Sequence, residues 1–190
     1  MDGWETRRKR IKGHDFCIIK LGLSGTIRSF EIDTAFFTGN HSPFVSIQGA
    51  CLSDDLDFNR KSEMGTCASL DDIAKVEALT ASWKMLLPLS KLEPGYPETR
   101  FNRFNCTLNE RITHLKVNMH PDGGIARLRV YGIVQIDWSK VSAEKSLDLA
   151  CLENGGRAVS CSNAHYGQPM NLLSKDPSKG KKLQNNSRNV

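Results

Sequence analysis

The hydrophobic and polar positions along the chain follow the pattern of short β-strands. Residues 26–40 alternate between two faces, one with Phe30, Ile32, Thr34 and Phe36 and the other with Glu31, Asp33 and Ala35. A period of two predicts a strand with one buried face. The apolar run 16–22 and the segment 43–52, with Val45 and Ile47 on one side, indicate two more strands. Between the first two of these strands, Gly22, Ser24 and Gly25 predict a turn.

One segment has the spacing of a helix. In residues 71–87 the apolar positions recur every three or four residues, at Ile73, Val76, Leu79 or Thr80, and Trp83. This spacing predicts one short helix, followed by a strand or an extended segment. After it, Pro88, Pro94, Gly95 and Pro97 predict a long irregular connection.

Two further alternating runs flank a Pro-Asp-Gly-Gly sequence. Residues 113–119 place Leu115, Val117 and Met119 opposite His114, Lys116 and Asn118, and residues 125–132 place Ala126, Leu128 and Val130 opposite Arg127, Arg129 and Tyr131. The sequence between them predicts a hairpin turn, because proline fixes φ, aspartate can bond its own backbone and glycine accepts a positive φ. A plain hairpin does not explain His120 or the two arginines.

Many short strands with one helix predict a mainly β fold, an antiparallel β-sandwich with one short helix. Helices do not alternate regularly with the strands, which argues against a parallel α/β sheet. The chain has 190 residues, and its shares of apolar and charged residues, 39% and 25%, are those of a globular domain with a real core.

The net charge of +5 is concentrated in the tail. Residues 175–190 hold five Lys and Arg residues against Asp176 alone, so the rest of the chain is nearly neutral. The charge is therefore weak evidence for nucleic acid or a membrane as a partner, and we expect neither. No stretch has the roughly 18 apolar residues of a membrane span. We expect a soluble protein of the cytoplasm, with the peroxisome as the alternative compartment.

The cysteines and histidines do not predict a cofactor. The six cysteines are scattered, with no CxxC pair, which indicates free thiols in a reducing compartment. A metal site from His114, His120 and Asp122 is conceivable, but two histidines six residues apart do not define a coordination geometry. We expect no metal and no other cofactor.

The segment "HPDGGIARLRVYG" (residues 120–132) resembles a signature of the allantoicase family, and "DGWETRRKR" (residues 2–10) resembles a second one. The segments "IDTAFFTGN" (32–40) and "SWKMLLP" (82–88) are also similar to that family, so the resemblance covers roughly residues 1–173. It implies a galactose-binding-domain-like jelly roll, a β-sandwich of which the family's full-length enzyme has two copies.

The resemblance also implies a domain organisation. Each family repeat begins with strands before the "GWETRR" motif, whereas this chain starts at the motif. We therefore expect residues 1–140 to be a first repeat without its leading strands and residues 141–152 to be a linker. Residues 153–173 resemble the start of a second repeat, and residues 174–190 should be a disordered basic tail. The chain would then be a truncated form.

The family hydrolyses allantoate to ureidoglycolate and urea in purine (allantoin) degradation. This chemistry needs a guanidinium for the substrate carboxylate, an acid for the departing urea nitrogen and a base. The resemblance makes His120, Asp122 and Glu5 the candidates for proton transfer. It makes Arg7, Arg127 and Arg129 the candidates for substrate binding.

Structural explanations compete with each role. Asp122 could be a turn residue, Glu5 could pair with a neighbouring arginine while Trp4 packs in the core, and Arg127 or Arg129 could lie on a solvated face. The basic run "RRKRIK" also fits a nuclear-localisation or nucleic-acid patch.

The sequence leaves the oligomeric state and the activity of the chain open. A chain without edge strands exposes unpaired backbone, so we expect a homo-oligomer. A truncated form could have weak activity or none. The alternatives to an enzyme are a non-enzymatic jelly-roll binding module and a vestigial product without a stable fold.

Overall fold

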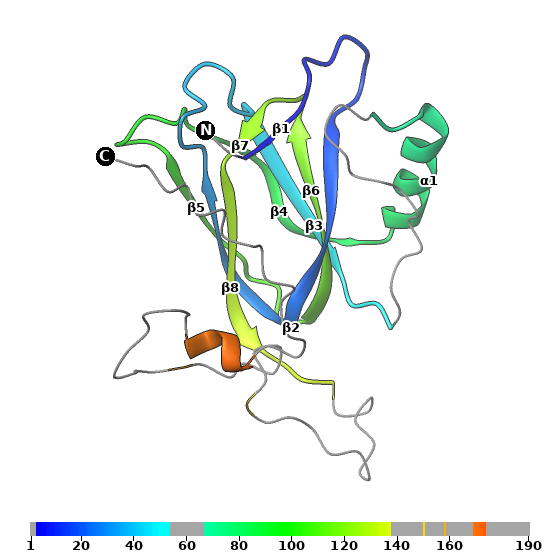
Figure 1. The fold of residues 1–190 in the computed structure, drawn as a ribbon. Helices are drawn as coiled ribbons and strands as arrows, with labels where there is room; N and C mark the ends of the chain where they lie inside the picture. Colours follow the sequence, from blue (N-terminus) through cyan, green and yellow to red (C-terminus); the bar gives the residue numbers. More distant parts are fainter. Residues whose placement is uncertain (1–2, 54–66, 138–149, 151–157, 159–168, 174–190) are drawn as a thin grey trace, which may run out of the picture. The chain divides into compact units, whose positions relative to one another are not determined.

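The computed structural model describes residues 3–53, 67–137, 150, 158 and 169–173 (Figure 1). The chain divides into two compact units, Met1–Ile136 and Asp137–Val190, and the first contains all the described strands. The predicted linker, second-repeat start and basic tail fall almost entirely outside the described residues. From them the structure describes mainly a short 3₁₀ helix, η3 (Pro169–Leu173). None of the described helices is long and apolar enough to cross a membrane.

The first layer of the sandwich contains four antiparallel strands in the order β4-β3-β6-β2. These are β4 (Lys84–Lys91), β3 (Phe44–Ala50), β6 (Arg111–His120) and the first half of β2 (Asp15–Asp33). The segments predicted as strands at 43–52 and 113–119 both lie here. The strand that follows the helix is β4.

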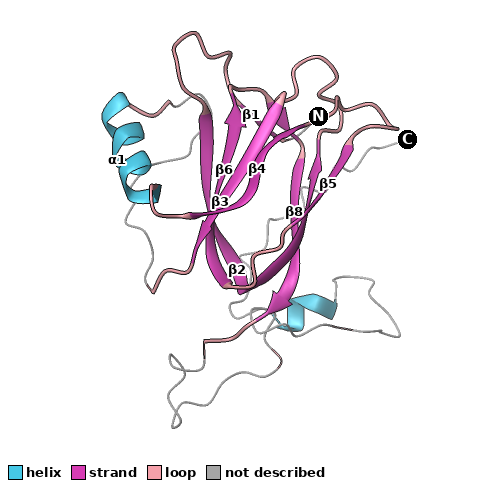
Figure 2. Ribbon diagram, turned by 180° about the vertical axis from the view of Figure 1, so that it is seen from behind, coloured by secondary structure: helices cyan, strands magenta, loops and turns pink. Residues whose placement is uncertain are grey.

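The second layer is built on the other half of β2. There β2 pairs with β5 (Phe101–Asn105) and with β8 (Arg127–Val134), again antiparallel. The strand belongs to both layers and changes register between Lys20 and Gly25, so one continuous sheet folds over on itself (Figures 1 and 2). The turn predicted at residues 22–25 is therefore wrong, because the chain bends there without leaving the strand.

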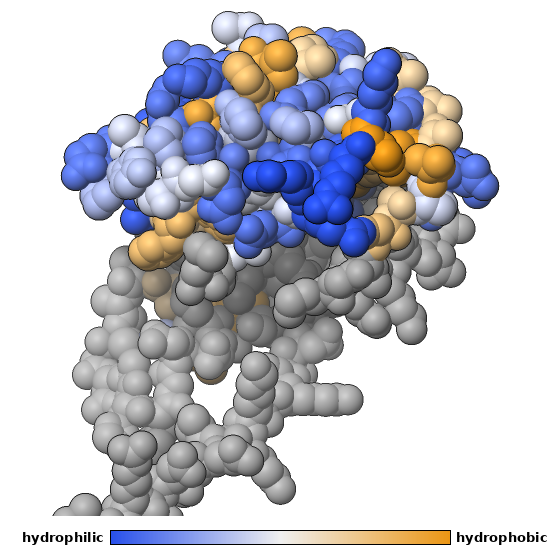
Figure 3. Space-filling model, turned by 90° about the horizontal axis from the view of Figure 1, so that it is seen from above, coloured by the Kyte–Doolittle hydropathy of each residue, from blue (hydrophilic) through white to orange (hydrophobic). Residues whose placement is uncertain are grey.

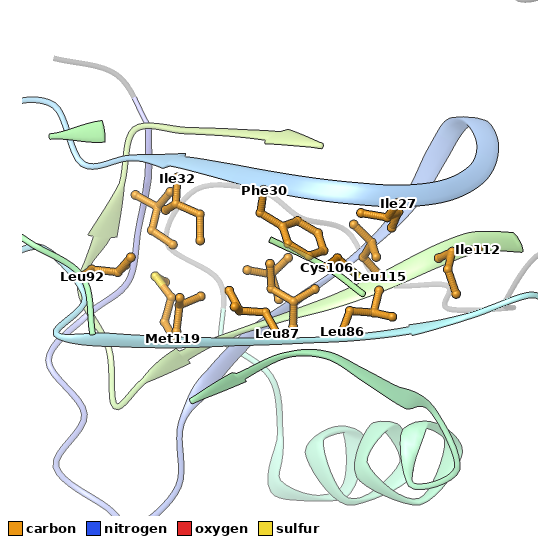
Figure 4. Close-up of a cluster of buried hydrophobic side chains, with 14 residues drawn as sticks. Ile27, Phe30, Ile32, Leu86, Leu87, Leu92, Cys106, Ile112, Leu115 and Met119 are labelled. Atoms are coloured by element: carbon orange, nitrogen blue, oxygen red, sulfur yellow. The ribbon is translucent and has the colours of Figure 1, made fainter. Parts of the chain in front are cut away.

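The hydrophobic core fills the space between the two layers (Figure 4). Its fully buried members come from alternate positions of three strands, Phe30 and Ile32 of β2, Val45 and Ile47 of β3, and Leu115 and Met119 of β6. The predicted inward faces of these strands are thus confirmed. Burial of these side chains is the main force that holds the layers together.

The predicted short helix is α1 (Leu70–Thr80). Ser69 caps it, since its side chain accepts the amide of Asp72 while the Asp72 carboxylate accepts the amide of Ser69. Val76 and Thr80 are its buried residues. Trp83 is also buried but follows the end of the helix.

Two predictions about the strand segments are wrong. Phe36 was expected on a buried strand face, but β2 ends at Asp33 and Phe36 is 69% exposed with a φ of 69°. The next residue, Phe37, takes the buried position. The long irregular connection was expected from Pro88, yet Pro88 lies within β4 and the connection ends at the unpredicted strand β5.

The predicted hairpin is also wrong. Strand β6 pairs with β2 and β3 in the first layer, whereas β8 pairs with β2 in the second, so the Pro-Asp-Gly-Gly turn takes the chain from one layer to the other. Within this crossover, β7 (Gly124–Ile125) pairs with β1 (Trp4–Glu5). The turn therefore binds the amino-terminal segment.

Candidate functional site

The two sequence motifs lie side by side. Trp4 is opposite Ile125 and Glu5 is opposite Gly124 in the antiparallel β1–β7 pair. The pairing continues beyond β1, where the amide of Thr6 donates to the carbonyl oxygen of Gly123 over 2.9 Å. Residues at opposite ends of the first unit are thus joined by backbone hydrogen bonds at one end of the sandwich.

The glycines of the turn permit this close approach. Gly123 has a φ of +132°, and a Cβ there would lie 2.6 Å from the amide nitrogen of Ser42. A Cβ on Gly124 would lie 2.1 Å from ring atoms of Phe37. Only glycine fits between the amino-terminal strand and the loop 34–42 at these two positions.

Asp122 anchors the segment that follows β1. Its Oδ2 accepts the backbone amide of Lys9 over 2.7 Å, and the Lys9 ammonium forms a 2.8 Å ion pair with Asp15. The structure therefore gives Asp122 a long-range structural contact, beyond the local turn bonds that the sequence suggested. This contact favours the structural explanation for Asp122.

His120 ends β6 on the outer face of the first layer, away from the core. Its Nε2 lies 2.9 Å from the Ser46 hydroxyl oxygen, and its ring lies 4.6 Å from the His14 ring between centroids. Burial, and secondarily the charge of His14, lower the pKa of His120 below its ordinary value of 6.5. A neutral imidazole is therefore favoured at pH 7.

Asn118, two residues before His120 on β6, connects these side chains. Its Oδ1 lies 3.0 Å from His14 Nε2, and its Nδ2 donates to the Ser46 hydroxyl oxygen at 3.2 Å and to Gln48 Oε1 at 3.3 Å. Asn118 and Ser46 are both buried. The result is a hydrogen-bonded polar row that crosses β3 and β6 and includes His14, the residue before β2.

The row continues beneath α1. Lys116 is 1% exposed, and its ammonium lies 2.8 Å from Glu77 Oε1 and donates to Thr80 Oγ1 over 3.1 Å. The same ammonium lies 5.0 Å from the centre of the Phe16 ring. Glu77 in turn lies 3.8 Å from His14 Nε2, so the helix contributes charge to the row.

Glu5 and Arg7 occupy exposed positions on the amino-terminal segment. Glu5 Oε1 accepts the side-chain amide of Asn40 over 2.7 Å, so its partner is not the arginine that the sequence suggested. The Arg7 guanidinium donates to the Cys67 sulfur over 2.8 Å. Both side chains start from the segment that pairs with the turn.

Arg127 and Arg129 lie on the outer face of the second layer. Arg129 donates to Glu31 over 3.1 Å, and Arg103 binds the same carboxylate over 2.8 Å. Arg127 donates to the carbonyl oxygen of Ala126. The core separates this face from the one that carries His120, so the structure does not bring Arg129 and His120 together.

The end of the sandwich near β1 and β7 is mainly hydrophilic, with hydrophobic patches between the polar residues (Figure 3). One of its histidines, His41, has a buried Nδ1 without a hydrogen-bond partner among the described residues. Nowhere among the described residues do three His, Cys, Asp or Glu side chains gather in a way that could hold a metal ion.

Sequence reasoning missed His14, Ser46 and Asn118. The alternation in β6 does contain a signal, because it places three polar residues, His114, Lys116 and Asn118, on the face opposite a fully apolar one. A solvated face explains such a pattern equally well. The register that sets Ser46 opposite Asn118 is a tertiary property.

Comparison with known proteins identifies the family of this chain. Residues 1–135 match the allantoicase repeat. The chain belongs to the allantoicase family. A probable allantoicase of Photobacterium profundum is 38% identical over 184 residues, which cover 96% of this chain and 48% of that protein. The allantoicase of Dictyostelium discoideum is 40% identical over 173 residues, covering 91% of this chain and 41% of the relative.

Solved allantoicase structures have the same fold. One allantoicase superposes with a TM-score of 0.56 at 34% identity, covering 92% of this chain and 47% of the other. The allantoicase of Saccharomyces cerevisiae superposes with a TM-score of 0.53 at 35% identity, with the same coverage of 92% and 47%. The chain thus spans about half the length of the allantoicases that it matches.

Proposed function

We propose that this chain carries an allantoicase reaction centre, which hydrolyses allantoate to ureidoglycolate and urea in allantoin degradation. The observation that carries the proposal is the pairing of the two family motifs through β1 and β7. This pairing fixes Glu5 and the segment before Arg7 against the turn that follows His120. Family membership supports the proposed reaction, and the joined motifs support its proposed location.

The proposed roles follow from the chemistry of each group. Allantoate carries a carboxylate and two ureido groups on one carbon, and hydrolysis replaces one carbon–nitrogen bond with a bond to the oxygen of water. Water loses one proton, and the departing urea nitrogen gains one. A guanidinium suits the substrate carboxylate because it can form two parallel hydrogen bonds.

We assign the carboxylate to Arg7, since the contact of Arg7 with a cysteine sulfur leaves most of its donors for a ligand. Glu5 is the proposed acceptor for the proton of water, and His120 is the proposed donor toward the departing ureido group. Asp122, Arg127 and Arg129 remain candidates from the resemblance. The contacts of Asp122 with Lys9 and of Arg129 with Glu31 favour structural roles for these two.

The experiment is a urea-release assay on purified chain with allantoate. We expect turnover by wild type, and losses of about 100-fold or more in kcat/KM for His120→Gln, a typical effect of removing a donor to charge that develops in the transition state. Arg7→Gln should raise KM. Arg103→Gln is the control, since it removes a surface guanidinium bound to Glu31. Binding of allantoate without urea release would favour a non-enzymatic binding module.

We further propose that the chain forms a homo-oligomer. Among the described strands β4 pairs on one side only, and Met85 and Leu89 on it are exposed. An unpaired edge with apolar side chains favours association with a second copy. Light scattering coupled to size exclusion measures the mass, and a monomer at all concentrations would contradict the proposal.

A further inference from the structure

We propose that Ser46 and Asn118 are positioning residues that hold His120 as a neutral imidazole with Nε2 as the hydrogen-bond acceptor, so that Nδ1–H is the group available to a bound ureide. The tautomer follows from the hydrogen-bond row itself. Its use toward allantoate rests on the proposed function.

The orientation of the Asn118 amide is the first step. Its Nδ2 lies 3.5 Å from the backbone carbonyl oxygen of Ser46 and 3.2 Å from the Ser46 hydroxyl oxygen. A carbonyl oxygen can only accept, so the amide must turn its nitrogen toward Ser46. The amide oxygen then faces His14, whose Nε2 lies 3.0 Å away and must donate.

The Ser46 hydroxyl is the second step. A hydroxyl group has one proton to donate and two lone pairs to accept with. One lone pair accepts from Asn118, and His120 Nε2 lies 2.9 Å from the same oxygen. Among the described residues, Nε2 is the acceptor within reach of the Ser46 proton, because the other contact of this hydroxyl comes from the Asn118 donor. We therefore assign the Ser46 proton to Nε2, which makes that nitrogen the acceptor. A neutral imidazole with an accepting Nε2 carries its proton on Nδ1.

The charges around His120 favour the neutral form. The His14 ring is 4.6 Å away between centroids, and burial and His14 both lower the pKa of His120. The Glu77 carboxylate lies 3.8 Å from His14 Nε2 and pairs with the ammonium of Lys116. The contact that this row gives the His120 ring is with a second imidazole, and a charge on His14 disfavours a proton on His120.

The chemical consequence is a role as hydrogen-bond donor. The carbonyl oxygens of the ureido groups are acceptors, and negative charge develops on a ureido group as it departs as urea. A fixed Nδ1–H directed at that oxygen stabilises the developing charge without a change in the protonation of Nε2. The proton that water loses then requires a separate acceptor, which the proposed role of Glu5 provides. The same proton passes from Glu5 to the departing urea nitrogen, so that urea leaves neutral.

The test is nuclear magnetic resonance of the full chain labelled with ¹⁵N-histidine, without allantoate. We expect His120 to show a protonated Nδ1 and a bare Nε2 at pH 7. Ser46→Ala removes the donor to Nε2, so we expect a mixture of tautomers and a His120 pKa raised by about 0.5 to 1, as the loss of one hydrogen bond predicts. Ser46→Thr retains the hydroxyl and should restore the wild-type pattern.

Thr113→Val is the matched control. The Thr113 hydroxyl lies 2.9 Å from His114 Nδ1 on the same strand, so this variant should change the His114 signals and leave those of His120 in place. A wild-type His120 with its proton on Nε2 would overturn the proposal. An unchanged tautomer in folded Ser46→Ala would also overturn it. If Ser46→Ala does not fold, the wild-type spectrum still shows whether the His120 proton is on Nδ1 or on Nε2.

The failure of this proposal is distinct from the failure of the proposed function. The tautomer is measured without substrate, so absence of urea release does not alter it. If wild type releases urea, Ser46→Ala should lower kcat more than it raises KM, because the hydrogen bond acts on the departing group. If Ser46→Ala shows the predicted change of tautomer but has the same kcat as wild type, the tautomer has no catalytic use. The conclusion that Ser46 positions the His120 proton would then still hold.

Discussion

The Lys9 amide and the Asp122 carboxylate are joined by a 2.7 Å hydrogen bond across 113 positions of sequence. Together with the β1–β7 pair, this bond closes the first unit of the chain on itself at the end that carries both family motifs. The two motifs thus supply the two sides of one contact. Each side needs its partner to hold its own conformation.

Removal of the Asp122 carboxylate should loosen the amino-terminal segment. We expect Asp122→Ala to lower the free energy of unfolding by about 1.5 to 3 kcal/mol, the typical value for a hydrogen bond to a charged group. Asp122→Asn keeps an acceptor and should cost less. Guanidinium denaturation measures both, with Glu98→Ala at an exposed loop position as the control. Equal stability of Asp122→Ala and wild type would show that the bond does not hold the segment.

Substitution of Gly124 should disturb the same contact from the other side. A Cβ would lie 2.1 Å from ring atoms of Phe37, so we expect Gly124→Ala to cost about 1 to 3 kcal/mol through overpacking. Gly39→Ala is the matched control, because a Cβ there meets nothing within 4 Å. Thermal unfolding of the two variants should separate them clearly. Similar midpoints would contradict the close packing of the turn.

The ion pair between α1 and β6 predicts an asymmetric result. Glu77→Ala leaves the buried Lys116 ammonium without its carboxylate and should cost about 1 to 3 kcal/mol, a reduced value because Glu77 is 47% exposed. Lys116→Met leaves only a solvated carboxylate and should cost less. The double variant should be more stable than Glu77→Ala alone. Denaturation of the two single variants and the double variant measures this order. A larger loss of stability in Lys116→Met than in Glu77→Ala would contradict the prediction.

The lowered pKa of His120 predicts a loss of stability in acid. The unfolded chain binds a proton at this residue more readily than the folded chain, so stability falls as pH drops below the ordinary value of 6.5 and levels off below the folded pKa. His120→Gln should remove this part of the pH dependence. Denaturation from about pH 8 to about pH 5 measures the difference between wild type and variant. Parallel curves would contradict the lowered pKa.

Much of the fold could be predicted from local patterns. The alternation in residues 113–119 indicated the buried face of β6, and the spacing of Ile73 and Val76 indicated α1. Both signals depend on the faces of single elements. The mainly antiparallel architecture follows from many such strands.

The errors arise where tertiary contacts decide. The turn after His120 has the composition of a hairpin, but the strands on its two sides pair with different halves of β2. Strand β6 pairs with β2 in the first layer, and β8 pairs with β2 in the second. Phe36 continues the alternation of β2, yet the strand ends at Asp33, whose carboxylate accepts two hydrogen bonds from Arg100. The roles of Ser46 and Asn118 depend on the register between β3 and β6, which no local pattern contains.

The central claim is that the joined motifs with His120 form an allantoate-hydrolysing site. Urea release from allantoate by wild type, His120→Gln and Arg103→Gln, measured side by side on folded protein, tests it most directly. The account predicts turnover by wild type and Arg103→Gln and a loss of about 100-fold or more in His120→Gln. Equal turnover in all three proteins, or no turnover in any of them, would contradict it.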